Sequence, residues 1–332
     1  MSKNAVILGG GAIAINFHLP RVKTMLGAER VVVVEVSAPR REELAREFGS
    51  DRSVEIVESL PATGQFDFAV IATPPKFHFE YFEQLKGRAR DILIEKPMTL
   101  NAEEARRVAE ICAGGGPRVY VALIRRTLGG FALIREMIRA NQFGALKKVT
   151  LTEGGIFGWM AVSMGSFSRT LNGGGVLMDT GPHTIDLLFQ VFDTVEFQAS
   201  WMDADLSEGG ETIEANCTLD LLADGAVPVR LSLSRNRNFS NLAVFEFEAA
   251  VCKVGVRDDE VTVDMASGVP LKAMPTDEFA EMGKDFKALF DRYYARFLLR
   301  QDNTGVAPED SEKIARIIDA AYQNAQPIKG GF

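Results

Sequence analysis

The sequence predicts a two-domain protein, with an α/β domain followed by an α+β domain. The chain has 332 residues, about twice the length of a typical domain. Its first third alternates short apolar runs with amphipathic stretches, which is typical of a doubly wound parallel sheet covered by helices on both faces. The later part carries consecutive strand-like segments with few helices, which indicates a largely antiparallel sheet. We place the boundary so that the domains are residues 1–124 and 125–332.

The expected strands of the first domain are apolar runs rich in branched residues, at 5–8, 31–36, 66–71, 92–94 and 118–121. Amphipathic helices are expected between them, at 40–48, 77–85 and 102–112. Asn101 and Glu104 stand where a helix cap and its box partner would precede the last of these helices. The run Gly-Gly-Gly-Pro at 114–117 predicts that this helix stops before the next strand.

The second domain is expected to open with a helix over 131–141. Alternating or β-branched segments then predict strands at 148–153, 195–202, 211–222, 227–234, 242–250 and 261–265. Asp224 and Gly225 stand between two of these segments as a hairpin signal. Helical patterns return at 277–300 and, after a proline, at 310–324.

The composition excludes several classes of protein. Lys and Arg number 37 against 45 Asp and Glu, a net charge of −8, so nucleic acid and anionic membranes are not expected partners. The three cysteines, Cys112, Cys217 and Cys252, stand too far apart for a disulfide framework or a metal site, which favours a reduced, cytoplasmic protein without a metal. No apolar run reaches about 18 residues, and the first run is too short for a signal peptide.

A glycine-rich turn follows the first expected strand and opens a helix. Gly9, Gly11 and Ala14 fit the pattern G-x-G-x-x-G/A, in which the glycines allow a tight turn and close approach of a pyrophosphate. The small third residue lets the helix pack on the strand, and the helix start at Ala12 and Ile13 offers N–H groups to phosphates. A glycine-rich turn without a ligand is the alternative. In this context the pattern predicts a Rossmann dinucleotide-binding domain.

Glu35 ends the second expected strand, 21 residues after Ala14. A carboxylate there can accept hydrogen bonds from the adenosine ribose hydroxyls and repel a 2′-phosphate, so we expect NAD as the cofactor. Arg40 and Arg41 stand close by and could hold that phosphate, so NADP stays an alternative.

Two further motifs follow the strands that end near residues 71 and 94. They read Ala-Thr-Pro-Pro-x-x-x-His and Glu-Lys-Pro, and ligands of open α/β sheets bind beyond the carboxyl ends of the strands. Lys96 could instead be a solvated lysine in a turn, and His78 a helix-start histidine without a ligand. The residues of interest in the two motifs are Thr73, Pro74, His78, Glu95, Lys96 and Pro97.

The fourth motif, over 173–186, begins Gly-Gly-Gly and contains Asp179 and His183. Pro182 suits the first position of a helix, with Thr180 or Gly181 near the cap. His183 would then lie in the first turn, where the positive end of the helix dipole favours the neutral imidazole that a general base requires. The alternative is a capping aspartate with a packed histidine.

These four motifs in this order resemble the Gfo/Idh/MocA family, which includes glucose–fructose oxidoreductase and inositol dehydrogenase. The resemblance covers essentially the whole chain. It implies a Rossmann domain followed by an α+β domain with a large open sheet, through which relatives form homodimers or homotetramers. It also implies an oxidoreductase that interconverts a secondary alcohol and a ketone on a sugar, cyclitol or sugar derivative by hydride transfer to or from NAD(P).

By the same resemblance, Lys96 would hold the reacting oxygen, His183 would take or give the hydroxyl proton, and Asp179 would position substrate and imidazole. An ammonium group near a developing alkoxide and a nearby base both lower the barrier to hydride transfer. The residues that would line the cofactor are Thr73, Pro74, His78 and Glu95.

The segment after the last strand of the first domain departs from the family pattern. Many relatives read Gly-Phe-Asn-x-Arg-Phe there, whereas this chain reads Ala-Leu-Ile-Arg-Arg-Thr over 122–127. Arg126 fits the pattern, and we expect it and Trp159 to contact a substrate that carries an acidic or apolar group beyond a bare sugar ring. Alternatively, Arg126 pairs with an acid of the second domain, Arg125 is solvated and Trp159 packs in the core.

Two rival functions stay open on the sequence. An NAD-dependent glycosidase of the same fold would oxidise its substrate transiently and return the hydride. A regulator that only senses a ligand would not need an acid/base apparatus, so Lys96, Asp179 and His183 argue against it.

Overall fold

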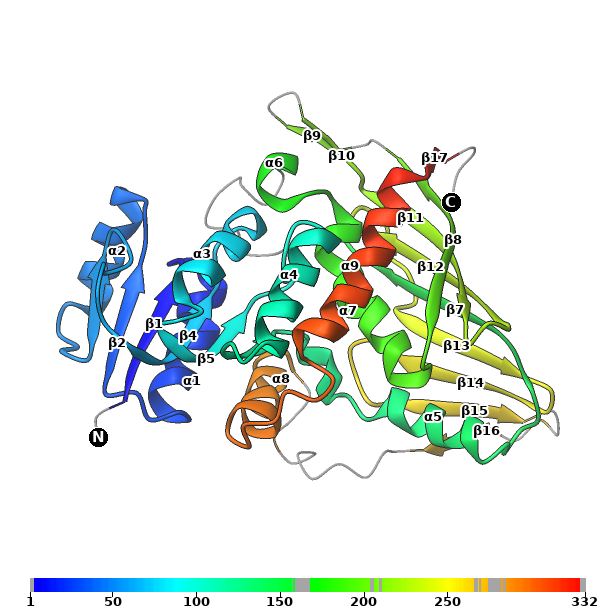
Figure 1. Cartoon of the computed structure of the whole chain (residues 1–332). Helices are drawn as coiled ribbons and strands as arrows, with labels where there is room; N and C mark the ends of the chain where they lie inside the picture. The colour runs from blue at the N-terminus through cyan, green and yellow to red at the C-terminus, as the bar shows by residue number, and fades with distance from the viewer. Residues whose placement is uncertain are drawn as a thin grey trace.

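Two sheets with helices between and around them form the protein (Figure 1). The computed structural model describes residues 3–156, 158, 168–203, 206–208, 211–265, 268, 270–273, 282 and 285–328. Within these ranges the first sheet has six parallel strands and the second has nine strands of mixed direction. The predicted combination of a doubly wound domain with a largely antiparallel α+β domain is therefore confirmed.

The first sheet has the strand order β3-β2-β1-β4-β5-β6. Strands β2 and β3 are therefore added on one side of β1 and strands β4 to β6 on the other, which places the switch point of the parallel sheet between β1 and β4. Its strands are β1 (Asn4–Leu8), β2 (Arg30–Val34), β3 (Val54–Val57), β4 (Phe66–Ile71), β5 (Ala89–Ile94) and β6 (Arg118–Val121). The central strands are apolar and buried on both faces, as expected for a parallel sheet between two layers of helices. The edge strand β3 is short and is interrupted by Glu55, which is why no continuous apolar run marked it.

The helices of the first domain begin and end near the predicted positions. They are a π-helical turn (Ala14–His18) that continues into α1 (Leu19–Thr24), then α2 (Ala38–Phe48), α3 (His78–Leu85) and α4 (Ala102–Ala113). The side chain of Asn101 accepts a hydrogen bond of 2.9 Å from the Glu104 amide, so the predicted cap is confirmed. The Glu104 carboxylate reaches the amide of Leu100, not that of the cap itself.

The second sheet has the order β16-β15-β14-β13-β7-β12-β11-β8-β17 in the described part of the chain. Only the pairs β7–β12 and β8–β17 are parallel there. The strands are β7 (Leu146–Gly154), β8 (Val195–Met202), β11 (Asn216–Ala223), β12 (Val227–Ser234), β13 (Leu242–Phe247), β14 (Ala250–Gly255), β15 (Val261–Met265), β16 (Pro270–Ala273) and β17 (Ala325–Pro327). Asp224 and Gly225, both at positive φ, form the predicted hairpin turn between β11 and β12.

Two predicted strands are each divided in the structure. The run 211–222 separates into β10 (Glu211–Ile213), which pairs with β9 (Leu206–Glu208), and β11. The Asp203 carboxylate accepts hydrogen bonds from the amides of Ala215 and Asn216, and this contact diverts the backbone between the two strands. The run 242–250 separates into β13 and the first residue of β14, joined by a turn that has no glycine or proline to mark it.

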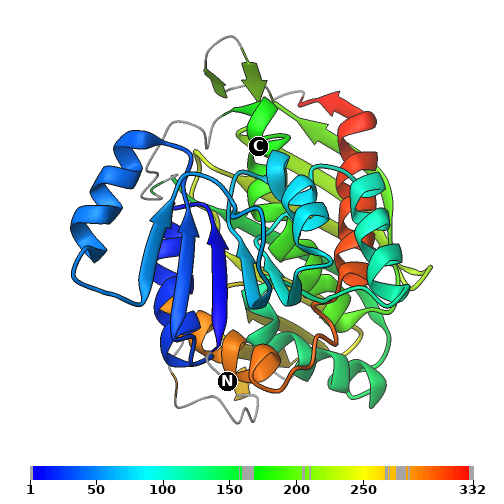
Figure 2. The ribbon, with the colours of Figure 1, turned by 60° about the vertical axis from the view of Figure 1, so that its left-hand side comes forward.

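Helices cover one face of the large sheet, the face toward the first domain (Figure 1). They include α5 (Gly130–Arg139), α7 (Val176–Val191) and α9 (Pro308–Gln323), while the short α6 (Arg169–Asn172) precedes α7. Every second residue along β11 is buried, as expected for a sheet with one covered face. In both views α9 lies beside α4, so the end of the chain returns to the first domain (Figure 2).

The helix predicted over 277–300 is described only from residue 285 onward, apart from residue 282. It forms α8 (Phe286–Tyr293), which Asp285 caps at its N-terminus, and a π-helical turn (Tyr294–Leu298). The boundary at residue 124 stays a prediction.

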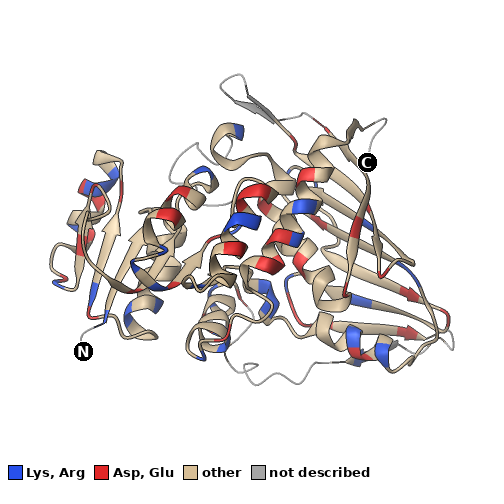
Figure 3. Cartoon of the chain, in the orientation of Figure 1, with Lys and Arg blue, Asp and Glu red and all other residues tan. Residues whose placement is uncertain are grey.

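Acidic and basic residues are interspersed on α4 and α9 (Figure 3). None of the helices that the structure describes is both long and apolar enough to cross a membrane. Cys112, Cys217 and Cys252 are all free thiols.

Candidate active site

A cleft of about 1090 Å³ lies at the carboxyl ends of the first sheet and continues to α7 and the ends of β7 and β12. Ligand pockets are commonly about 300–1,000 Å³, so this cleft has room for more than one small molecule. Most predicted site residues line it: Gly9, Gly11, Ala12, Ile13, Glu35, Arg40, Thr73, Pro74, Glu95, Lys96, Pro97, Asp179 and His183. Ala14, His78 and Arg126 do not line it, and Trp159 lies outside the described residues.

The glycine-rich loop forms one wall of the cleft. Gly9 has a φ of +100°, and a Cβ there would lie 2.5 Å from the carbonyl oxygen of Ala72, so only glycine fits the turn. A Cβ on Gly11 would meet no atom within 4 Å, so this residue leaves open space beside the backbone, where a pyrophosphate can approach. Ala14 lies fully buried below the loop, where its small side chain lets the helix approach the sheet.

Glu35 holds the loop and the start of α2 together. Its carboxylate accepts hydrogen bonds from the amides of Gly10, at 2.9 Å, and Ser37, at 2.7 Å. Arg40 donates from Nε to the Gly10 carbonyl and from Nη1 to Glu43. Arg41 donates to the backbone carbonyl of Glu35 and does not line the cleft. The residues present therefore fit a dinucleotide, with a carboxylate at the place of the adenosine ribose.

His78 was predicted to line the cofactor, and this prediction is corrected. Its ring is 1% exposed, and its two nitrogens lie 2.7 Å from the Thr73 carbonyl and 2.9 Å from the Pro97 carbonyl. Burial lowers the pKa of His78, so a neutral ring donates to one carbonyl at a time. His78 thus connects the loops that contain Thr73 and Pro97 through their backbone carbonyls, and these loops line the cleft.

Glu95 connects the cleft to a buried polar network that the sequence did not indicate. One carboxylate oxygen lies 2.9 Å from Nε2 of His18, and Nδ1 of His18 lies 2.8 Å from the hydroxyl of Tyr294. Its other oxygen accepts a hydrogen bond from the Lys96 amide. The network ties the loop that carries Lys96 to the C-terminal part of the chain.

The helix that carries Asp179 and His183 begins earlier than predicted. It starts at Val176, so Pro182 lies inside α7 and not at its first position. The carboxylate of Glu214 accepts hydrogen bonds from the amides of Gly175 and Leu177 and so satisfies the helix start in place of a local cap. A Cβ on Gly175 would lie 2.0 Å from the Glu214 carbonyl oxygen, which explains the last glycine of the motif.

Three charged side chains meet on the floor of the cleft. Nζ of Lys96 lies 2.6 Å from Oδ1 of Asp179 and donates to its carbonyl at 2.9 Å, while Arg235 lies 2.9 Å from Oδ2. Burial opposes ionisation of Asp179, but the two cations outweigh it and hold the pKa of this carboxyl below its usual range. Arg235 follows β12 directly, and a charged residue just after a buried strand is the signal that could have identified it.

His183 lies one helical turn after Asp179 and lines the same cleft, with 8% of its surface exposed. Burial and the positive charges of Arg125 and Lys96 hold its pKa well below the ordinary 6.5, so the imidazole is neutral. The neutral state agrees with the sequence-based expectation, but its cause is burial among cations and not the first turn of a helix. No hydrogen bond joins His183 to Asp179 in the described residues.

The two neighbouring arginines point to different partners, and Arg126 follows the alternative expectation of a pair with an acid of the second domain. Arg126 pairs with buried Asp186, from Nη2 at 2.7 Å, and does not reach the cleft, so its prediction as a substrate contact is corrected. Arg125 lines the cleft and holds the buried Glu153 of β7 through two hydrogen bonds, at 2.6 and 2.8 Å. Arg257 contacts the same carboxylate at 2.9 Å.

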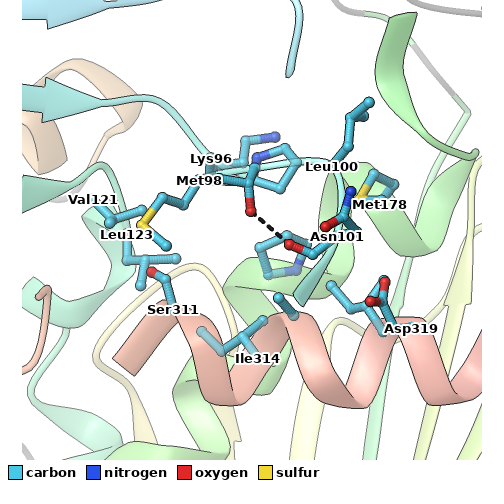
Figure 4. A pocket seen from close by; sticks show the side chains of 15 residues that line it. Lys96, Met98, Leu100, Asn101, Val121, Leu123, Met178, Ser311, Ile314 and Asp319 are labelled. Atoms are coloured by element: carbon cyan, nitrogen blue, oxygen red, sulfur yellow. Dashed lines mark hydrogen bonds between the residues drawn. The ribbon is translucent and has the colours of Figure 1, made fainter. Parts of the chain in front are cut away.

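A second, small cavity lies behind the loop of Lys96, against α9 (Figure 4). Its walls are mostly apolar and include Met98, Leu123 and Ile314. It separates the loop from the helix and offers few polar groups to a ligand. Among the described residues, no group of three or more His, Cys, Asp or Glu is arranged to hold a metal ion.

Comparisons with known proteins identify the family and agree with the fold. Residues 3–123 match the family described as "Oxidoreductase family, NAD-binding Rossmann fold", and residues 131–252 match the "GFO/IDH/MocA C-terminal domain". KijD10, a 3-ketoreductase from Actinomadura kijaniata solved with NADP and TDP-benzene, has the same fold, with a TM-score of 0.79 at 17% identity over 99% of both chains.

Two curated relatives match over part of their length. Inositol 2-dehydrogenase from Rhizobium meliloti is 27% identical over 146 residues, which is 44% of this chain and 43% of that protein. Glucose-6-phosphate 3-dehydrogenase from Bacillus subtilis is 24% identical over 194 residues, 58% of this chain and 54% of that protein. The chain thus spans about half the length of these relatives. Since the two family matches together cover most of the sequence, the chain belongs to the Gfo/Idh/MocA oxidoreductase family, with an NAD-binding Rossmann domain at residues 3–123.

Proposed function

We propose that this protein interconverts a secondary alcohol and a ketone on a sugar, a cyclitol or a sugar derivative, with NAD as the preferred cofactor. The observation that carries the proposal is the cluster of Lys96, Asp179 and Arg235 beside a neutral His183, in the same cleft as the glycine-rich loop. The relatives named as inositol 2-dehydrogenase and glucose-6-phosphate 3-dehydrogenase support a ring alcohol as the substrate class.

Each side chain of the cluster has a distinct part in the proposed reaction. The nicotinamide, when bound, accepts or donates the hydride. Lys96 holds the reacting oxygen and stabilises its negative charge as the carbon–hydrogen bond breaks. Neutral His183 takes the hydroxyl proton during oxidation and returns it during reduction. Asp179, ionised between Lys96 and Arg235, fixes the position of the Lys96 ammonium group and not that of the imidazole.

A screen of cofactor reduction over sugars, cyclitols, uronates and sugar nucleotides tests the proposal. We expect NADH to accumulate in proportion to at least one substrate. Cleavage of a glycosidic bond with the cofactor retained through many turnovers would favour the NAD-dependent glycosidase instead. Ligand binding without redox change or bond cleavage would favour the sensing regulator.

Cofactor choice should follow Glu35. We expect a lower Kd for NADH than for NADPH, because a 2′-phosphate would lie against the Glu35 carboxylate, and we expect Glu35→Gln to narrow the difference. Titration of both cofactors by fluorescence measures it, with Glu47→Gln as a control at an exposed carboxylate of α2 outside the cleft. Tighter binding of NADPH by the wild type would assign the preference to Arg40.

Homodimer or homotetramer formation and a cytoplasmic location stay predictions. The face of the large sheet that the described helices leave uncovered is the surface on which a second copy would pack (Figure 1).

A further inference from the structure

We infer that the substrate carries an anionic group, a carboxylate or a phosphate, which Arg257 binds at the end of the cleft formed by the second domain, beside Glu153 of β7. The inference rests on the proposed function, because it names the class of sugar derivative that this site takes. It replaces Arg126, which pairs away from the cleft, as the residue that reads the substrate's charge.

The charges that line this end of the cleft do not balance. The cationic side chains there outnumber the carboxylates of Glu153 and Asp179. An excess of positive charge remains when the carboxylate of Glu95, beside Lys96, is also counted. His183 adds no charge, because its imidazole is neutral. The described cationic side chains lining this end are Lys96, Arg125, Arg235 and Arg257. An anionic substrate would neutralise the excess in a cleft that also receives a positively charged nicotinamide.

Arg257 is the member of this group that is available to a ligand. Arg125 is 13% exposed and uses both terminal nitrogens on Glu153, and Arg235 is 7% exposed beside Asp179. Arg257 uses Nε and Nη2 on Glu153, is 55% exposed, and its Nη1 has no hydrogen-bond partner among the described residues. A guanidinium held on one side by a buried carboxylate presents its other side in a fixed direction, which suits recognition of an anion.

The position of Arg257 relates this anion to the reacting carbon. Arg257 lines the same cleft as His183 and shares the Glu153 carboxylate with Arg125, which follows β6 on the Lys96 side of that cleft. A group bound to Arg257 and a hydroxyl beside His183 can therefore belong to one small molecule. This arrangement favours a uronate, an aldonate or a phosphorylated sugar over a neutral hexose or cyclitol.

Calorimetry on the NADH-loaded full chain tests the inference with matched probes. The pairs are glucose with glucuronate, galactose with galacturonate, and glucose with glucose 6-phosphate, which separates carboxylate from phosphate. We expect at least one anion to bind about tenfold more tightly than its neutral parent, as one good charge-assisted contact supplies. We expect Arg257→Gln to reduce this preference to less than about threefold. Glu153 keeps its two bonds to Arg125 in that variant, so the fold should persist.

The control variant is Arg139→Gln on α5, whose side chain is 60% exposed and lies outside the cleft. It should keep the full preference for the anion. Equal binding of neutral and anionic partners by the wild type, an unchanged preference in Arg257→Gln, or no binding of any anion would each overturn the inference. Turnover of neutral alcohols with NADH release in those cases would leave the proposed function standing. Conversely, Arg257-dependent anion binding without any redox turnover would overturn only the proposed function.

Discussion

Lys96→Met should abolish most turnover while it leaves cofactor affinity within about tenfold of the wild type. The lost interaction is the charge that stabilises the developing alkoxide, and removal of one such group costs about 10²–10³ in rate. The substitution should preserve the fold, because Arg235 still holds the Asp179 carboxylate at 2.9 Å. Steady-state kcat with a substrate found in the screen, and titration with NADH, measure the two effects.

Lys76→Met is the matched control for this experiment. Lys76 lies on the short 3₁₀ turn Pro75–Phe77, is exposed, and does not line the cleft. It should keep the wild-type kcat. Wild-type turnover in Lys96→Met would make Lys96 an ordinary lysine of the turn, and an equal loss in both variants would point to a general effect of charge.

His183→Ala should lower the rate of oxidation by about 10²–10⁴, the usual contribution of a positioned general base. Only the neutral ring accepts a proton, and burial among Arg125 and Lys96 holds the pKa of His183 well below 6.5. The wild-type rate should therefore stay level from neutral pH to below 6.5. It should fall only as the pH drops through the lowered pKa, and this acidic limb should be absent from the variant.

Titration of Asp186 could also make the rate of oxidation depend on pH. Burial raises its pKa to about 7, although Arg126 opposes the shift. An Asp186→Asn variant should remove any change near pH 7 and keep the limb at lower pH. If the acidic limb persists unchanged in His183→Ala, another group is the base, and Lys96 is the first candidate.

The local motifs placed most of the cleft correctly because parallel strands end at one edge of a sheet. Gly9, Glu35, Thr73 and Lys96 each follow a different strand of the first sheet, so their common location could be predicted from the strands alone. The strand ends do not predict how deeply each side chain is buried. His78 belongs to one of these motifs, yet it lies below the loops and bonds to their carbonyls.

The two arginines after β6 show the limit of a local reading. They lie on a 3₁₀ turn, Ile124–Thr127, in which successive side chains point about 120° apart, so neighbouring arginines can turn to different partners. The sequence pattern favoured Arg126. Its buried partner Asp186, 60 residues away along the chain, draws it to the opposite side.

The sequence by itself determined the domain types, the strand ends that form the cleft, and the presence of an ammonium, a carboxylate and an imidazole there. These features depend on residues a few positions apart in the chain, and the regular backbone of a strand or turn sets their relative positions. The tertiary structure alone decided which charges meet. Lys96 and Asp179 are 83 residues apart, and Glu214 caps α7 from 39 residues away. Such contacts have no signature in the neighbouring sequence. A buried charge is stable only when it is paired, and the fold decides which oppositely charged group lies near it.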